Sequence, residues 1–120
     1  MKTNNLHYFF VLTLLPFLVF AQSTIDGKVI DGEFNDVLPF ANVILYSQSE
    51  DGNLVNLEGS TTDFDGNFSF SDLPAGVYTI DISFVGYSTV KISDIVLKVG
   101  DVVPISITLQ PASSELEEVV

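Results

Sequence analysis

The chain has 120 residues, of which 16 are acidic and only four are basic, and its formal net charge is −12 at pH 7. The sequence contains no arginine and no cysteine. A basic surface for nucleic acid therefore cannot form, and neither disulfides nor a lipoprotein-type lipid anchor is expected.

Residues 1–21 are predicted to be a cleavable export signal. An apolar run from Leu6 to Phe20 follows a short polar stretch, and the segment ends in Val-Phe-Ala, with small residues where signal peptidase requires them. The run is shorter than a membrane-spanning helix, contains a proline and is not followed by a basic cluster. We expect cleavage before Gln22, which leaves three lysines against 16 carboxylates, a net charge of −13.

Seven segments of the exported part are predicted to be β-strands, because apolar and polar residues alternate in them between turn signals. In chain order they are residues 24–30, 41–47, 57–62, 67–71, 78–84, 90–97 and 103–109. In the clearest one, Tyr78, Ile80, Ile82 and Phe84 share one face, while Thr79, Asp81 and Ser83 are expected to face water. We predict one all-β domain over residues 22–110, an antiparallel Greek-key β-sandwich of about seven strands, prealbumin-like or Ig-like. Residues 111–120 are expected to be an acidic linker.

The sequence offers few side chains for catalysis. Its one histidine, His7, lies in the predicted signal, so the exported part lacks imidazole, thiol and guanidinium groups. Most carboxylates fall at turns or on solvent-facing positions, where solvation explains them. We therefore predict no enzymatic activity and no cofactor.

One acidic segment resembles a fragment of a calcium loop. Asp63, Asp65 and Asn67 alternate as oxygen ligands around Gly66. The helical flanks and the bidentate glutamate of an EF-hand are missing, however, and Asp-Gly is a strong hairpin signal. A hairpin turn is thus favoured over a metal site.

A sugar-stacking surface is a second alternative. Phe34, Phe40 and Phe64 fall in predicted loops, whereas the other aromatic residues occupy mostly core-facing positions, and the chain has no tryptophan. Three scattered rings do not define a groove, so carbohydrate binding remains a minority hypothesis.

Five blocks in order resemble the carboxypeptidase regulatory-like domain over essentially the whole exported part. They are Ile25-Asp26-Gly27-Lys28-Val29, Leu38-Pro39-Phe40-Ala41-Asn42-Val43, Thr62 to Phe70 as Thr-x-x-x-Gly-x-Phe-x-Phe, Leu73-Pro74-Ala75-Gly76-Val77-Tyr78, and Ser83-Phe84-Val85-Gly86-Tyr87. The last block is similar to a corner seen where this domain precedes outer-membrane receptors of Bacteroidota. The resemblance implies a non-enzymatic β-sandwich.

The tail extends the resemblance. Leu116, Glu117, Glu118, Val119 and Val120 look like the start of the TonB box of SusC-like TonB-dependent receptors. The resemblance implies the periplasmic accessory or docking domain of a nutrient-uptake receptor, here as a truncated front end. Implied partners are TonB or another periplasmic or outer-membrane protein, bound by strand addition, and the receptor plug and barrel if the chain continues. This segment is not expected to insert into a membrane. The alternative is a freestanding periplasmic or secreted β-sandwich that binds carbohydrate or protein.

Overall fold

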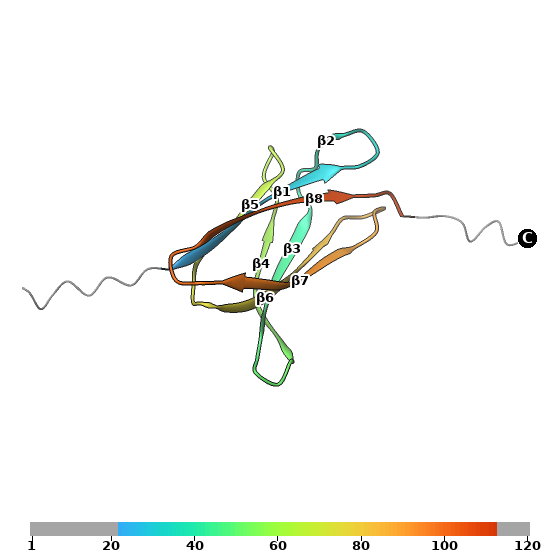
Figure 1. Ribbon diagram of the computed structural model, residues 1–120. Helices are drawn as coiled ribbons and strands as arrows, with labels where there is room; N and C mark the ends of the chain where they lie inside the picture. The colour runs from blue at the N-terminus through green and yellow to red at the C-terminus, as the bar shows by residue number, and fades with distance from the viewer. Residues whose placement is uncertain (1–21, 113–120) are drawn as a thin grey trace, which may run out of the picture.

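The computed structural model describes residues 22–112, so the predicted signal and the residues after Ala112 lie outside the described part of the chain. Eight strands and no helix occur within these residues (Figure 1). The strands are β1 (Ser23–Asp31), β2 (Asp36–Val37), β3 (Asn42–Gln48), β4 (Leu54–Thr61), β5 (Asn67–Leu73), β6 (Gly76–Ser83), β7 (Val90–Leu97) and β8 (Val102–Leu109). Residues 22–112 accordingly hold no helix able to cross a bilayer.

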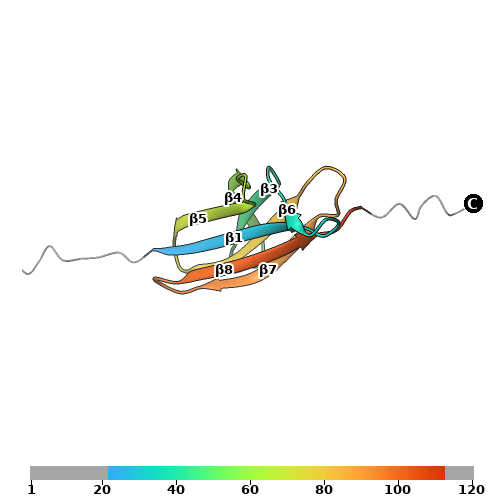
Figure 2. The same ribbon diagram turned by 90° about the horizontal axis from the view of Figure 1, so that it is seen from above.

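The strands form two four-stranded sheets that pack face to face, as the view from above shows (Figure 2). In the first sheet, β1 pairs with β2 and β5 on one side and with β8 on the other. In the second sheet, the order is β4-β3-β6-β7. The predicted all-β sandwich is confirmed. Seven strands overlap the predicted segments, and β2 is a two-residue addition that is too short to show an alternating pattern.

One pairing differs from the antiparallel pattern. β1 and β8 run parallel over eight residue pairs, from Thr24 beside Val102 to Asp31 beside Leu109, whereas the other strand pairs are antiparallel. A parallel pair needs a long crossover rather than a tight turn, and here the rest of the domain provides it. Alternation within single strands carries no information about this direction.

The core forms because alternate side chains of both sheets point inward. In β1 the inward positions include Ile25 and Val29, and in β8 they include Ile107 and Leu109, all with at most 4% of their surface exposed. The buried apolar core consists of Ile25, Val29, Leu38, Ala41, Val43, Leu45, Phe68, Phe70, Leu73, Tyr78, Ile80, Ile82, Ile95, Leu97, Ile107 and Leu109.

The turn at Asp65-Gly66 is not a hairpin between paired strands, and this prediction was wrong. Locally the chain does reverse, because the Gly66 N–H donates to the Asp63 carbonyl at 2.9 Å and Gly66 adopts φ 78°. However, β4 before the turn pairs with β3, and β5 after it pairs with β1. The turn residues determine the reversal, whereas burial of the apolar face of β5 determines which sheet it joins.

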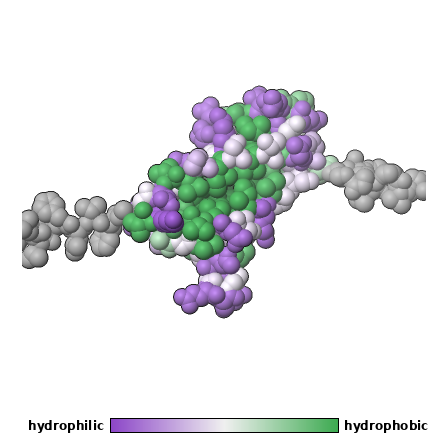
Figure 3. All heavy atoms as spheres, in the orientation of Figure 1, coloured by the Kyte–Doolittle hydropathy of each residue, from purple (hydrophilic) through white to green (hydrophobic). Residues whose placement is uncertain are grey.

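The sandwich has two open flanks, at which edge strands of the two sheets lie side by side (Figures 1 and 2). We call them the β4–β5 flank and the β7–β8 flank. Figure 3 shows hydrophobic surface gathered on the side where β7 and β8 lie. Val90 and Ile92 on β7, and Val103 and Ile105 on β8, are the partly exposed residues that pack against the core there.

Candidate functional site

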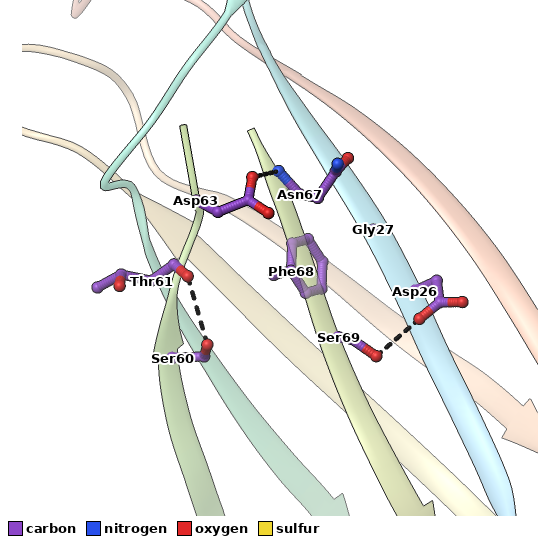
Figure 4. A pocket seen from close by; sticks show the side chains of 8 residues that line it. All are labelled: Asp26, Gly27, Ser60, Thr61, Asp63, Asn67, Phe68 and Ser69. Carbon is purple, nitrogen blue, oxygen red and sulfur yellow. Dashed lines mark hydrogen bonds between the residues drawn. The ribbon is translucent and has the colours of Figure 1, made fainter. Parts of the chain in front are cut away.

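A hollow of about 510 Å³ opens on the β4–β5 flank. This volume lies within the range of small-molecule and side-chain pockets. Figure 4 shows that Ser60 and Thr61 of β4 stand on one side, and that residues of β5 and β1 stand on the other. The lining residues are Asp26, Gly27, Ser60, Thr61, Asp63, Asn67, Phe68 and Ser69.

The aromatic ring of Phe68 lies over Gly27 and forms the apolar wall of the hollow (Figure 4). The two residues are register partners in the β1–β5 pair. A Cβ atom at position 27 would lie 2.0 Å from Cζ of Phe68, so a side chain at this position would displace the ring. One contact therefore links Gly27, in the first block, with Phe68, in the third.

The polar rim of the hollow presents mainly hydrogen-bond acceptors. The Ser69 hydroxyl donates to Oδ1 of Asp26 at 2.7 Å. Oδ1 of Asp63 accepts the backbone N–H groups of Asp65 and Asn67, each at 2.9 Å. Because the lining contains two carboxylates and no basic residue, the hollow suits a ligand group that donates hydrogen bonds or carries positive charge.

The calcium candidates are only partly brought together in the hollow. Asp63 and Asn67 line it. Asp65 is not among the lining residues, and its backbone N–H donates to the Asp63 carboxylate within the turn. Asp63 uses one carboxylate oxygen to hold that turn. Within residues 22–112 no three His, Cys, Asp or Glu side chains are grouped as they would be around a metal. Calcium binding thus stays the less favoured alternative to a turn, and the predicted partner segment, Leu116 to Val120, lies outside the described residues.

Two loop aromatics lie together, so the interpretation of three scattered rings was wrong for this pair. The rings of Phe40 and Phe64 are 5.2 Å apart and nearly perpendicular, and both are more than half exposed. They are close because the Phe40 N–H donates to the Thr62 carbonyl at 3.0 Å, just after β4. Local spacing could not reveal this contact between residues far apart in sequence. An edge-to-face pair is also not a flat surface for a sugar ring.

Tyr87, in the last family block, ties the two sheets at one end of the β7–β8 flank. Its hydroxyl donates to Oδ2 of Asp31 at 2.8 Å. This hydrogen bond, followed by burial and by the negative charges of Asp31 and Glu33, raises the pKa of Tyr87 to about 12. Burial acts to raise the pKa of Asp31, but the Glu33 N–H, the Tyr87 hydroxyl and the Phe34 N–H together lower it.

The same corner holds the chain after β8. The Ser88 N–H donates to the Gln110 carbonyl at 2.9 Å, and the Ala112 N–H donates to the Gly86 carbonyl at 2.8 Å. The corner block therefore has a structural role, in fixing where the chain leaves the sandwich. Sequence reasoning identified this block only through its resemblance.

Comparison with known proteins gives two findings from sequence. A family model described as the carboxypeptidase regulatory-like domain matches residues 24–110. A TonB-dependent receptor, P3 of Formosa agariphila, is 28% identical over 119 residues, which cover 99% of this chain and 10% of the receptor. The chain thus spans about a tenth of the length of that relative.

Solved structures resemble the chain in fold. Transthyretin from Sparus aurata has a TM-score of 0.61 and 16% identity, over 74% of this chain and 90% of its own. An (S)-allantoin synthase has a TM-score of 0.63 and 14% identity, over 78% of this chain and 42% of its own. At such low identities these likenesses show the prealbumin-like fold alone.

Proposed function

The chain belongs to the carboxypeptidase regulatory-like domain family, and we propose that it serves as the exported N-terminal accessory domain of a TonB-dependent outer-membrane receptor for nutrient uptake. In this role it is a periplasmic docking module without enzymatic activity. The observation that carries the proposal is the alignment of almost the whole chain with a small part of a named receptor.

The chemistry of the described residues fits binding better than catalysis. The hollow on the β4–β5 flank holds carboxylates, hydroxyls and one amide, and its polar groups accept hydrogen bonds from within the domain. Strand edges that lack a neighbour can pair with a partner through backbone hydrogen bonds. We therefore assign the domain a docking role.

The proposal includes both segments outside the described residues. Residues 1–21 act as the signal that exports the chain, and Leu116 to Val120 begin a TonB box that joins TonB as an added strand. A receptor plug and barrel follow in the full gene, so that the present chain is the front end of a longer protein.

Sequencing the coding DNA past the codon of Val120 tests the receptor assignment directly. An open frame that encodes a plug and about twenty or more amphipathic strands is expected. A stop codon at that position would contradict the proposal.

Two deletions in the full-length receptor test the roles of its parts. Deletion of residues 22–110 should impair uptake, and unchanged uptake would contradict the accessory role. Deletion of Leu116 to Val120 should abolish TonB binding, and unchanged TonB binding would contradict the TonB-box assignment.

The Phe40–Phe64 pair keeps a freestanding binding module as the alternative. Both rings are exposed, and Phe64 stands between Asp63 and Asp65 in the sequence, so a hydroxyl-rich ligand could contact one ring and donate hydrogen bonds to these carboxylates. A glycan array separates the two readings. Binding that is lost in Phe64→Ala would favour the alternative, and the accessory-domain proposal predicts no glycan binding by this domain.

A further inference from the structure

The outer strands of the sandwich differ in how far they obstruct an added strand. β8 contains Pro104, which cannot donate a backbone hydrogen bond. β7 is interrupted at Asp94, with φ 59°, beside a register shift, and it also carries Lys91. β5 is interrupted at Asp72, with φ 58°. Proline, lysine and irregular backbone are the devices by which sheet edges avoid pairing.

β4 has few of these devices. Its eight residues contain neither proline nor lysine, and no β4 residue has a positive φ. Its one irregularity is the register shift opposite Leu45 and Tyr46. Within residues 22–112, β3 is the only strand that is hydrogen-bonded to it. β4 therefore offers a long open row of backbone groups.

Three side chains of β4 are both apolar and exposed. Leu54, Val55 and Leu57 have 41%, 50% and 47% of their surfaces exposed. Three such residues along one edge strand provide contacts for the side chains of an added strand, in addition to the backbone pairing.

The surroundings of β4 are uniformly acidic. No basic residue occurs anywhere between Lys28 and Lys91, so β3, β4, β5 and their connections carry none. Carboxylates lie before, within and after the strand, at Glu50, Asp51, Glu58, Asp63 and Asp65. Hydrogen bonds from the Ser49 side chain and then the Asn53 backbone lower the pKa of Asp51, which keeps this carboxylate charged.

We propose that the β4 edge binds an extended, basic segment of a protein partner as an added β-strand. Apolar side chains on one face of that segment contact the exposed apolar side chains on the same face of β4, and its alternate lysine or arginine side chains meet the surrounding carboxylates. This inference rests on the proposed docking role and adds to it the docking strand and the chemistry of the partner.

The structure also indicates where such a segment would lead. β4 ends at Thr61, which lines the hollow together with Ser60 and with Asp63, two residues further along the chain (Figure 4). An added strand that pairs along β4 would thus pass the hollow. The hydrogen-bond acceptors of its rim can bind a cationic side chain of that strand.

A second copy of this chain is the less favourable occupant. Pairing two β4 edges would bring two identical acidic surfaces together, which like-charge repulsion opposes. A basic segment instead neutralises them. The negative charge around β4 therefore favours a basic partner segment over a second copy of this chain.

A synthetic peptide tests the inference on the purified exported chain. The probe alternates valine and lysine over about eight residues, the length of β4, and its control alternates valine and glutamate. We expect amide shift changes and slowed hydrogen exchange along residues 54–61 with the lysine peptide only. We also expect the affinity to fall at least about tenfold when ionic strength rises from about 0.05 to about 0.5 M. Equal binding of both peptides, changes centred on β7 or β8, or no binding would overturn the inference.

Lysine substitutions locate the site. Val55→Lys on β4 should weaken the lysine peptide at least about tenfold, because a cation on the edge repels it. Val96→Lys, at a 57% exposed residue on β7, is the matched control and should leave the affinity within about twofold. Equal weakening by the two variants would mean that net charge alone acts, and it would contradict a β4 site. Circular dichroism verifies that both variants are folded.

The variant Val55→Lys also distinguishes a failure of this inference from a failure of the proposed function. If deletion of residues 22–110 impairs uptake by the full-length receptor but Val55→Lys does not, docking through β4 is wrong and the accessory role stands. If the lysine peptide binds β4 while that deletion leaves uptake unchanged, the accessory role is wrong and the β4 binding edge stands.

Discussion

The two open flanks of the sandwich are bordered by edge strands of similar length, but they differ in charge and in protection. The β7–β8 flank carries apolar surface (Figure 3), together with Pro104 and Lys91 and the irregular backbone at Asp94. The β4–β5 flank has its apolar side chains on β4, is surrounded by carboxylates and contains the hollow. One flank is thus guarded against pairing, while the other leaves β4 open.

The comparison shows that exposed apolar surface alone does not identify a docking site. Both flanks expose apolar residues, yet a strand adds more readily where backbone groups are free and where few protecting features, such as proline, lysine or positive-φ residues, interrupt the edge. The difference between the flanks can be tested by changing the residues that build each one.

The largest expected effect concerns the wall of the hollow. Phe68→Ala removes a ring that is 5% exposed, and we expect it to lower the free energy of unfolding by about 3 to 5 kcal/mol. Phe64→Ala, at a ring that is 77% exposed, should change it by less than about 1 kcal/mol. Urea denaturation measures both values. Equal losses would show that the Phe68 ring does not support this flank.

Gly27→Ala provides a second check of the same contact. Its Cβ would meet the Phe68 ring, so we expect a loss of about 1 to 3 kcal/mol in the wild-type background. With Phe68 already changed to alanine, the loss should largely disappear. Additive losses in the double variant would contradict the contact.

A smaller effect is expected at Thr62, which follows β4. This residue is 1% exposed, and its hydroxyl donates to the Leu38 carbonyl at 2.7 Å and accepts the Ala41 N–H at 2.9 Å. Thr62→Val leaves both groups without this partner and should lower the free energy of unfolding by about 1 to 3 kcal/mol. The exposed neighbour Thr61 provides the control, because Thr61→Val should stay within about 0.5 kcal/mol.

On the β7–β8 flank, Tyr87→Phe should change how stability depends on pH. The pKa of Tyr87 is about 12 in the folded chain, against an ordinary value of 10.0. Since folding raises this pKa, the stabilisation is complete below about pH 10 and is lost as the pH rises towards 12. Calorimetry between pH 9 and about 12 should show a steeper fall in Tm for the wild type than for Tyr87→Phe. Parallel curves would mean that the hydroxyl does not tie the sheets.

The smallest effect on stability is expected at Pro104. Pro104→Val should change the free energy of unfolding by no more than about 0.5 kcal/mol, yet it restores a backbone donor to the β8 edge. We expect self-association of this variant in sedimentation velocity. Ser106→Val adds the same side chain two residues further along the strand, and equal association of the two variants would show that proline is not the protecting feature.

The sequence predicted strands best where alternation was regular. Tyr78, Ile80 and Ile82 are buried as expected, but Thr79, predicted to face water, is only 1% exposed. β6 lies between β3 and β7, so neighbouring strands help to cover its outer side as well. β4 begins at Leu54, earlier than the predicted start at Leu57, because its register shift interrupts the alternation.

The site was less accessible to sequence reasoning, because its contacts join residues far apart in the chain. The Gly27–Phe68 contact and the Phe40–Phe64 pair arise only when sheets form, and no local period encodes them. Asp63 was singled out only as a weak calcium candidate, whereas its carboxylate accepts two backbone N–H groups and caps the turn. The open edge of β4 could not be recognised before the strand order was known.

The parallel pairing of β1 with β8 has a consequence for the order of folding. β1 is flanked by β5 and β8, so the first strand to be synthesised completes its pairing only when the last one is present. Contacts of such long sequence separation slow folding, because loop closure precedes any gain from pairing. We therefore expect the domain to remain incomplete until residues 102–109 are available, so that a chain that stops short of β8 is a natural target for chaperones and proteases.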